Sequence, residues 1–351
     1  MVDVQLYVRG QIYSGWTEAT VTKSLDAIYG EAKLSLTRLN EQEAGTVPAI
    51  RIDDDARLTI DGQTRIAGYI KSRDLDINED GFDLNIVVHD KTSRLFRGSV
   101  VNFPGEWKNQ TALQIIEAVC KPFGVVVMAQ VPVGKPFEKF AAQPGDTAAK
   151  VIERVCRHRA LMVYADNNGQ LILTTAKAAT MLASEIRFHP ETGNALSLSL
   201  SEDIQHRHNE YICHTQSPGS NWGTSEHSKV VGRAKDRGIS SYCPLVVIGD
   251  EPGDETAMTK LATTTAAINA ARSESRDYLM AGCKSDDGKL WDINQKIRIV
   301  DSIEGLNAIR LISKIVFSIS DGKADETILT VMHPDAYELV AEPESKPGEA
   351  W

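Results

Sequence analysis

The sequence predicts a multidomain α+β protein in which two related β-rich domains flank an α/β module. Three observations lead to this prediction. Apolar and polar residues alternate through the first hundred residues, helical spacing replaces the alternation after Pro104, and two stretches 242 residues apart repeat the same order of strands. The expected domains are residues 1–103, 104–180 and 181–340, followed by a flexible tail at 341–351.

Length and composition are those of an ordinary globular protein. The 351 residues suffice for two to four domains, and 42% of them are hydrophobic. With 48 acidic and 38 basic residues the net charge is −10, which excludes a non-specific coat for nucleic acid. The five cysteines are widely spaced and are expected to be reduced. Without a secretory signal or an apolar stretch long enough to span a bilayer, the chain is predicted to be soluble and made in a cytoplasm.

The first domain is predicted from strands in which every second residue is apolar. Such alternation is typical of a strand with one buried face. Alternating runs occur at residues 2–8, 32–36, 58–60 and 84–88, and Asp-Gly turns at 61–62 and 80–81.

Helices characterise the middle module. Leu113, Ile116 and Cys120 share one helical face, after a candidate N-cap at Asn109 or Thr111. A second helix is expected from Asp146-Thr147. Apolar runs on either side of Asn167-Asn168-Gly169 then predict a β-hairpin.

Strands resume in the third segment. Residues 196–200 alternate strictly between leucine and serine, and a further strand is expected at Tyr211-Ile212-Cys213. A loop rich in glycine and serine follows at 217–224. Residues 256–280 are expected to form one long helix lying on the surface.

An internal repeat connects the two ends of the chain. Residues 69–72, 75–77 and 84–89 correspond to residues 311–314, 317–319 and 328–333. The offset is 242 residues before the turn and 244 after it, so the second turn is longer. Each copy also follows an alternating strand, which predicts two related β-domains.

No motif in the sequence indicates a catalytic, metal or cofactor site. The best metal candidates are His206, His208, Cys213 and His214, but a zinc site needs three or four converging ligands and a solvated polar strand is preferred. A Gly-x-Ser-x-Gly elbow and a His-Glu-x-x-His helix are absent. We therefore predict a protein that is not an enzyme and holds no cofactor.

Seven short segments stand in a distinctive order along the chain: residues 6–10, 16–17, 28–32, 209–211, 216–219, 290–294 and 297–301. In their order and spacing they resemble the baseplate hub proteins of Mu-like phages, the late-control-D group of contractile-tail proteins. The resemblance extends from residue 6 to about 337.

This resemblance implies a homotrimeric ring in the virion baseplate of a phage or prophage, synthesised in the host cytoplasm. Two tube-like β-domains per subunit would give six similar units around a channel, which resolves the mismatch between a three-fold hub and a six-fold tail tube. The implied partners are the hexameric tail tube, other baseplate proteins and the trimeric spike, and DNA would pass through the channel.

Two other functions are open at this point. A cell-wall hydrolase needs a catalytic pair and a substrate cleft, and the sequence indicates neither. A carbohydrate-binding module would use Trp16, Trp107, Trp222 and Trp291 as stacking platforms, but their scatter favours burial in a core or an interface. The interface residues stay unknown from the sequence.

Overall fold

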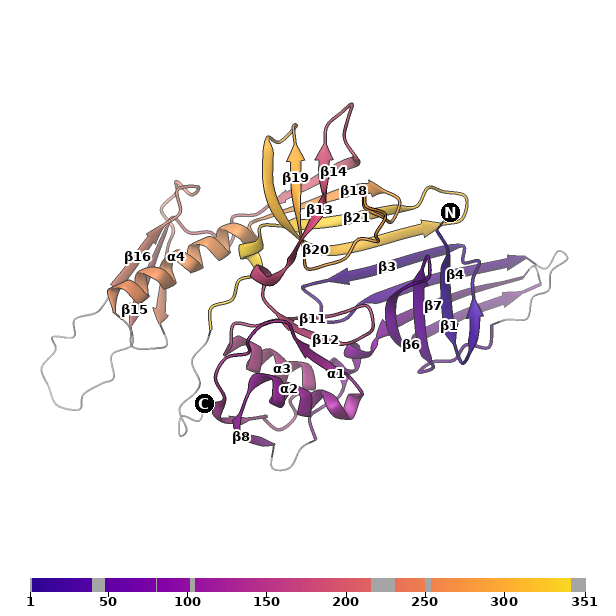
Figure 1. The fold of residues 1–351 in the computed structure, drawn as a ribbon, viewed down its shortest axis with the longest axis horizontal. Helices are drawn as coiled ribbons and strands as arrows, with labels where there is room; N and C mark the ends of the chain where they lie inside the picture. Colours follow the sequence, from indigo (N-terminus) through magenta and orange to yellow (C-terminus); the bar gives the residue numbers. More distant parts are fainter. Residues whose placement is uncertain are drawn as a thin grey trace, which may run out of the picture.

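The computed structural model describes residues 2–39, 48–79, 81–101, 105–215, 231–249 and 254–341 (Figure 1). Over these residues, one sheet of thirteen strands carries most of the hydrophobic core, and two smaller units are attached to it. The α+β class predicted from the sequence is confirmed. No helix in these ranges is long and apolar enough to cross a membrane.

The first seven strands form an N-terminal β-unit. Their apolar residues alternate as expected, so that Leu6, Val21, Leu34, Leu58 and Ile86 are all buried. In space the strands follow the order β3-β4-β7-β6-β5-β1-β2. Their bounds are β1 Val4–Val8, β2 Gln11–Tyr13, β3 Glu18–Ser24, β4 Glu31–Leu39, β5 Asp55–Ile60, β6 Gln63–Asn78 and β7 Gly81–Asp90.

Six later strands form a C-terminal β-unit with the order β14-β18-β21-β20-β19-β13. Their bounds are β13 Thr180–Phe188, β14 Ala195–Glu202, β18 Glu274–Ala281, β19 Gln295–Asp301, β20 Leu306–Ser320 and β21 Glu326–Met332. The long strand β20 corresponds to β6. Strand β6 pairs with β5 along its first half and with β7 along its second half. In the same way, β20 pairs with β19 along its first half and with β21 along its second half.

The two units share a β-bulge at the same place. In the pairing of β6 with β7, Lys71 is left out of register between Ile70 and Ser72. In the pairing of β20 with β21, Ser313 is left out between Ile312 and Lys314, 242 residues later. Because a bulge sets the local bend and twist of a strand, this shared position supports the repeat found in the sequence.

The two β-units are not separate sheets. Strand β3 pairs with the second half of β20, from Glu18 opposite Ser320 to Ser24 opposite Lys314. Val21 and Phe317 face each other at this joint, and both are fully buried. One core therefore runs through both units, which the sequence did not predict.

The insert module lies between the two units in the chain and has its own core. Thr111 begins its first long helix with a capping box that includes Gln114, and Thr147 caps the next. Leu95 and Val100 already pack in this core, so the N-terminal β-unit ends before the expected boundary at residue 103. The elements are η1 Lys91–Ser93, α1 Arg94–Arg97, β8 Glu106–Gln110, α2 Ala112–Cys120, η2 Lys121–Phe123, β9 Val127–Ala129, β10 Phe137–Ala141, α3 Ala148–Arg157, β11 Met162–Ala165, β12 Leu171–Thr174 and η3 Ala176–Ala178.

A side unit projects from the C-terminal β-unit, at the left of Figure 1. Helix α4 (Glu255–Arg272) covers one face of a three-stranded sheet, where Tyr211 and Cys213 pack against Met258 and Ala262. The sheet has the order β16-β15-β17. Its strands are β15 Glu210–Thr215, β16 Val231–Lys235 and β17 Pro244–Gly249, and the turn η4 Pro334–Tyr337 lies against α4.

The helix expected over residues 256–280 is wrong in its second half. Helix α4 ends at Arg272, and the following residues form strand β18 inside the large sheet. Arg276, Tyr278 and Met280 are buried while their neighbours are partly exposed, which is the pattern of a strand. The helix covers one face of the side unit.

Candidate assembly surfaces

A buried polar cluster joins the two β-units to the insert module. Asp292, in the loop before β19, lies 3.4 Å from the Arg65 guanidinium and 3.9 Å from the Lys23 ammonium. Asn167, from the hairpin between β11 and β12, accepts from Lys23 at 2.6 Å and donates to Asp292 at 2.6 Å. Lys23 and Arg65 are almost wholly buried, and burial lowers the pKa of both. Three parts of the chain are therefore fixed together by charge-assisted hydrogen bonds.

Asp90 is the last residue of β7 and directly precedes the insert module. Its carboxylate accepts from the backbone N–H groups of Gly30 and Thr92 and from the Thr92 hydroxyl. Burial nevertheless raises the pKa of Asp90 to about 6, against the opposing effect of these bonds and of Lys23. This carboxyl group titrates just below neutral pH.

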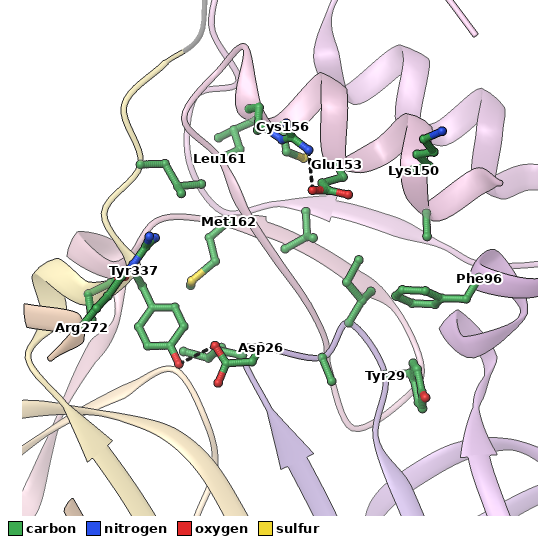
Figure 2. A pocket seen from close by; sticks show the side chains of 18 of the residues that line it. Asp26, Tyr29, Phe96, Lys150, Glu153, Cys156, Leu161, Met162, Arg272 and Tyr337 are labelled. Carbon is green, nitrogen blue, oxygen red and sulfur yellow. Dashed lines mark hydrogen bonds and ion pairs between the residues drawn. The ribbon is translucent and has the colours of Figure 1, made fainter. Parts of the chain in front are cut away.

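A cleft of about 1160 Å³ separates α3 from the two β-units (Figure 2). Its walls include Leu161 and Met162, and at its far side the Tyr337 hydroxyl donates to Asp26 at 2.9 Å. Burial raises the pKa of Cys156 to about 12, so this thiol is not an activated nucleophile. The cleft offers an apolar wall with a charged rim.

Among the described residues, several strands of the large sheet pair on one edge only, and they include β2, β13, β14 and the second half of β6. Strand β14 ends the sheet and pairs with β18 alone. The second half of β6, Ser72–Asn78, pairs with β7 on one edge only. Ile77 on β6 is 66% exposed and Leu196 on β14 is 58% exposed, although both lie on strands whose other apolar residues face the core. Unpaired edges with exposed apolar residues are ready to pair with another strand.

The sheet face opposite the core is polar and acidic. It is formed by β14, β18, β21, β20, β3, β4, β7 and the second half of β6. Cross-strand neighbours such as Thr37 and Asp83, or Ser35 and Asn85, hydrogen-bond along it. Lys33 and Lys314 are its two lysines. Its seven carboxylates are Glu18, Glu31, Asp74, Asp76, Asp83, Asp277 and Glu326.

The four metal candidates do not converge. His206 and His208 lie in the turn before β15 instead of on a strand, and His208 contacts Cys243 at 3.5 Å. Cys213 and His214 are neighbours on β15, so their side chains point to opposite faces and Cys213 enters the core of the side unit. No group of three potential ligands is found anywhere in the described ranges.

Three of the tryptophans lie in cores. Trp16, Trp107 and Trp291 are each at most 9% exposed, so none offers a face on which a sugar could stack. Trp222 and the tail at 342–351 lie outside the described residues. Sequence reasoning missed the polar cluster and the open strand edges, because the residues that form them are far apart in the chain. The repeat is the signal from which the edges could have been found.

Sequence models of two families match the first half of the chain. The model described as "Mu phage baseplate assembly protein GpP-like, N-terminal" matches residues 3–90, and "Baseplate hub protein gp44-like, second domain" matches residues 92–175. Baseplate hub protein gp44 of Escherichia phage Mu is 24% identical over 98% of this chain and 91% of its own length.

Solved structures of tail proteins share the whole fold. The 43 kDa tail protein of the Shewanella oneidensis prophage MuSo2 is 25% identical, with a TM-score of 0.83 over 96% of this chain and 100% of its own. A tail protein from Neisseria meningitidis MC58 is 17% identical, with a TM-score of 0.76 over 95% of this chain and 99% of its own. The large sheet and the parts attached to it are thus an arrangement found in other tail proteins.

Proposed function

This chain belongs to the family of Mu-like phage baseplate hub proteins, and on that premise we propose that three copies form a ring between the tail tube and the central spike. The protein is a structural component of the virion baseplate. The ring, its trimeric state and its contacts with a hexameric tube on one side and a trimeric spike on the other are the proposal.

The observation that carries this proposal is the repeat of β-units within one chain. Both units place their strands in the same spatial order, with a bulge at equivalent positions of β6 and β20. Three chains would present six similar units, so a three-fold ring would offer a nearly six-fold surface to the tube. A subunit with only one β-unit would have to form a hexamer to present the same surface to the tube. Such a hexamer would not share the three-fold symmetry of the spike.

The polar sheet face suits the lining of a channel. The core side of the sheet is covered by β1, β5, β13 and β19 and carries the insert module through Lys23 and Asn167. These bulky parts need the larger outer circumference of a ring, which leaves the polar face for the inside. Seven carboxylates against two lysines on this face would repel a passing DNA backbone and limit sticking.

We assign no catalytic role to the chain in this assembly. The cleft beside α3 holds an unactivated thiol, and the relatives are described as baseplate and tail proteins. Synthesis in the cytoplasm of the host bacterium belongs to the same proposal, since a baseplate is assembled before the particle leaves the cell.

Light scattering behind a sizing column tests the ring. We expect a particle of three times 38.5 kDa, and class averages in negative stain with six lobes around a hole. Purification with the co-expressed spike protein serves as the second condition. A monomer or dimer in both conditions would contradict the proposal.

A further inference from the structure

We propose that the side unit binds an amphipathic helix of another baseplate protein, with acidic residues along one flank of that helix. The docking site is the face of the sheet β16-β15-β17 that is turned away from α4. This inference rests on the proposed function, because it assumes that other baseplate proteins surround the chain.

The strand register separates the two faces of this sheet. Tyr211, Cys213 and Val247 point toward α4 and pack in the core of the side unit. The residues between them point the other way, because successive side chains of a strand alternate between the faces. The open face, turned away from α4, carries Glu210, Ile212 and His214 on β15, Val231, Arg233 and Lys235 on β16, and Pro244, Val246 and Ile248 on β17.

An apolar row on the open face is accessible to solvent. Val246 and Ile248 are each 58% exposed, although Val247 between them packs against α4. Ile212 lies opposite Val246 in the ladder and is half-buried. Neighbouring exposed apolar side chains that polar residues border are typical of a surface that binds another protein.

The direction of the strands favours a second layer on the open face. Strands β15 and β17 run parallel, from Glu210 opposite Pro244 to Thr215 opposite Gly249. Sheets of parallel strands are characteristically covered on both faces, and helices provide the cover. Among the described residues α4 covers one face only, so a second helix would complete the arrangement.

Basic side chains border the apolar row on β16. Arg233 forms an ion pair with Glu210 at 3.0 Å, and its side chain remains 59% exposed. Lys235 lies opposite the same Glu210 and is exposed, but it has no ion-pair partner among the described residues. In a chain with a net charge of −10, this border is a local excess of positive charge. Carboxylates on the flank of a partner helix would complement it.

The dimensions of the open face fit a short helix. Neighbouring strands lie about 4.8 Å apart, so β16 and β17 are roughly 10 Å apart, which is the diameter of one helix. From Pro244 to Ile248 the strand rises about 13 Å, which a helix of about nine residues spans. Such a helix would place apolar residues at i, i+3, i+4 and i+7 on Ile212 and Val246, with its acidic flank toward Lys235. A strand added to the free edge of β17 would not reach β16.

Alkylation of the full chain, free and in purified tail particles, tests whether the open face is covered. Cys243 is exposed and the other four cysteines are buried, so Cys243→Ser is the background and Val246→Cys the probe. Ala267→Cys, at an exposed position of α4, is the matched control. We expect a maleimide to modify Val246→Cys at least tenfold more slowly in particles than in the free chain, and the control at rates within twofold.

Carbodiimide coupling of particles that contain the wild-type chain identifies the occupant, because it joins an amine to a carboxylate in direct contact. We expect mass spectrometry to find Lys235 linked to an acidic residue of another protein, in a segment whose apolar residues recur at helical spacing. Lys235→Arg keeps the charge and should abolish the link, since a guanidinium does not couple.

Several results would overturn the docking site. Equal alkylation of Val246→Cys in both forms would mean that the open face stays uncovered, and equal protection of the control would mean that the cover is not specific to it. A link from Lys235 to a segment of alternating apolar residues, or to a second copy of this chain, would identify a different occupant. Protection without any link would exclude an acidic partner.

The proposed function fails by a different result. A trimer whose open face stays uncovered in particles would overturn this inference alone. Absence of the chain from purified particles would overturn the proposed function and this inference together.

Discussion

Removal of the Asp292 carboxylate should destabilise the junction of the three parts strongly. Asp292→Ala would leave the Lys23 and Arg65 cations, both at most 4% exposed, without the carboxylate that lies 3.9 Å and 3.4 Å from them. Lys23 can respond by losing its proton, because burial already lowers its pKa, but Arg65 cannot. Breaking a buried pair costs about 3–5 kcal/mol. Since Asp292 itself is about a quarter exposed, we expect a loss of about 3 kcal/mol in the free energy of unfolding.

Urea unfolding, followed by far-UV circular dichroism and by tryptophan fluorescence, measures this loss. Asp292→Asn separates charge from shape, and it should cost nearly as much if the charge dominates. Glu153→Ala is the control, because it removes an exposed pair with Arg157 on α3 and should cost at most about 0.5 kcal/mol. A loss below 1 kcal/mol for both Asp292 variants would refute the view that buried charges hold the insert module to the sheet.

Three further predictions concern the same framework. Burial raises the pKa of Asp90 to about 6, above the value in the unfolded chain, so the stability that this carboxyl group contributes is present below pH 4 and is lost as the pH rises through 6. In a pH series of urea unfolding, the free energy of unfolding of the wild type should therefore fall by about 3 kcal/mol more than that of Asp90→Asn between pH 4 and 7. Gly68→Ala should abolish soluble expression, because the added Cβ would lie 1.9 Å from the His89 carbonyl oxygen. The control Gly62→Ala, in the same hairpin, meets no atom and should lower the free energy of unfolding by about 1 kcal/mol through its positive φ alone. Equal yields of the two variants would contradict this prediction. Thr111→Ala should lower the free energy of thermal unfolding by about 1 kcal/mol, because α2 loses its N-cap, whereas Thr111→Ser keeps the capping hydroxyl and should not.

The formed joint between β3 and β20 gives the chain an asymmetry that an exact repeat would lack. Lys23 at this joint contacts Asn167 of the insert module, whereas Glu202 at the end of β14 is exposed. The insert module thus anchors on the joint within the chain.

The sequence by itself determined the local elements. Alternation of Val4, Leu6 and Val8 required a strand with one buried face, and Thr111 and Thr147 supplied caps that began helices where expected. The repeat was visible because a hairpin with a bulge has a fixed order of apolar positions, which residues 69–89 and 311–333 share. The resemblance to hub proteins followed from the same order and spacing.

Only the tertiary structure decided how these elements combine. Residues 274–281 fit either a helical stripe or a strand by their spacing, and the pairing of β18 with β14 and β21 makes them a strand. That β3 pairs with β20, and that Lys23, Asn167 and Asp292 meet, depends on contacts between residues far apart in the chain. Strand pairing forms hydrogen bonds between backbone groups that are the same at nearly every residue, so local sequence fixes which face is buried but leaves the partner of an edge to the fold as a whole.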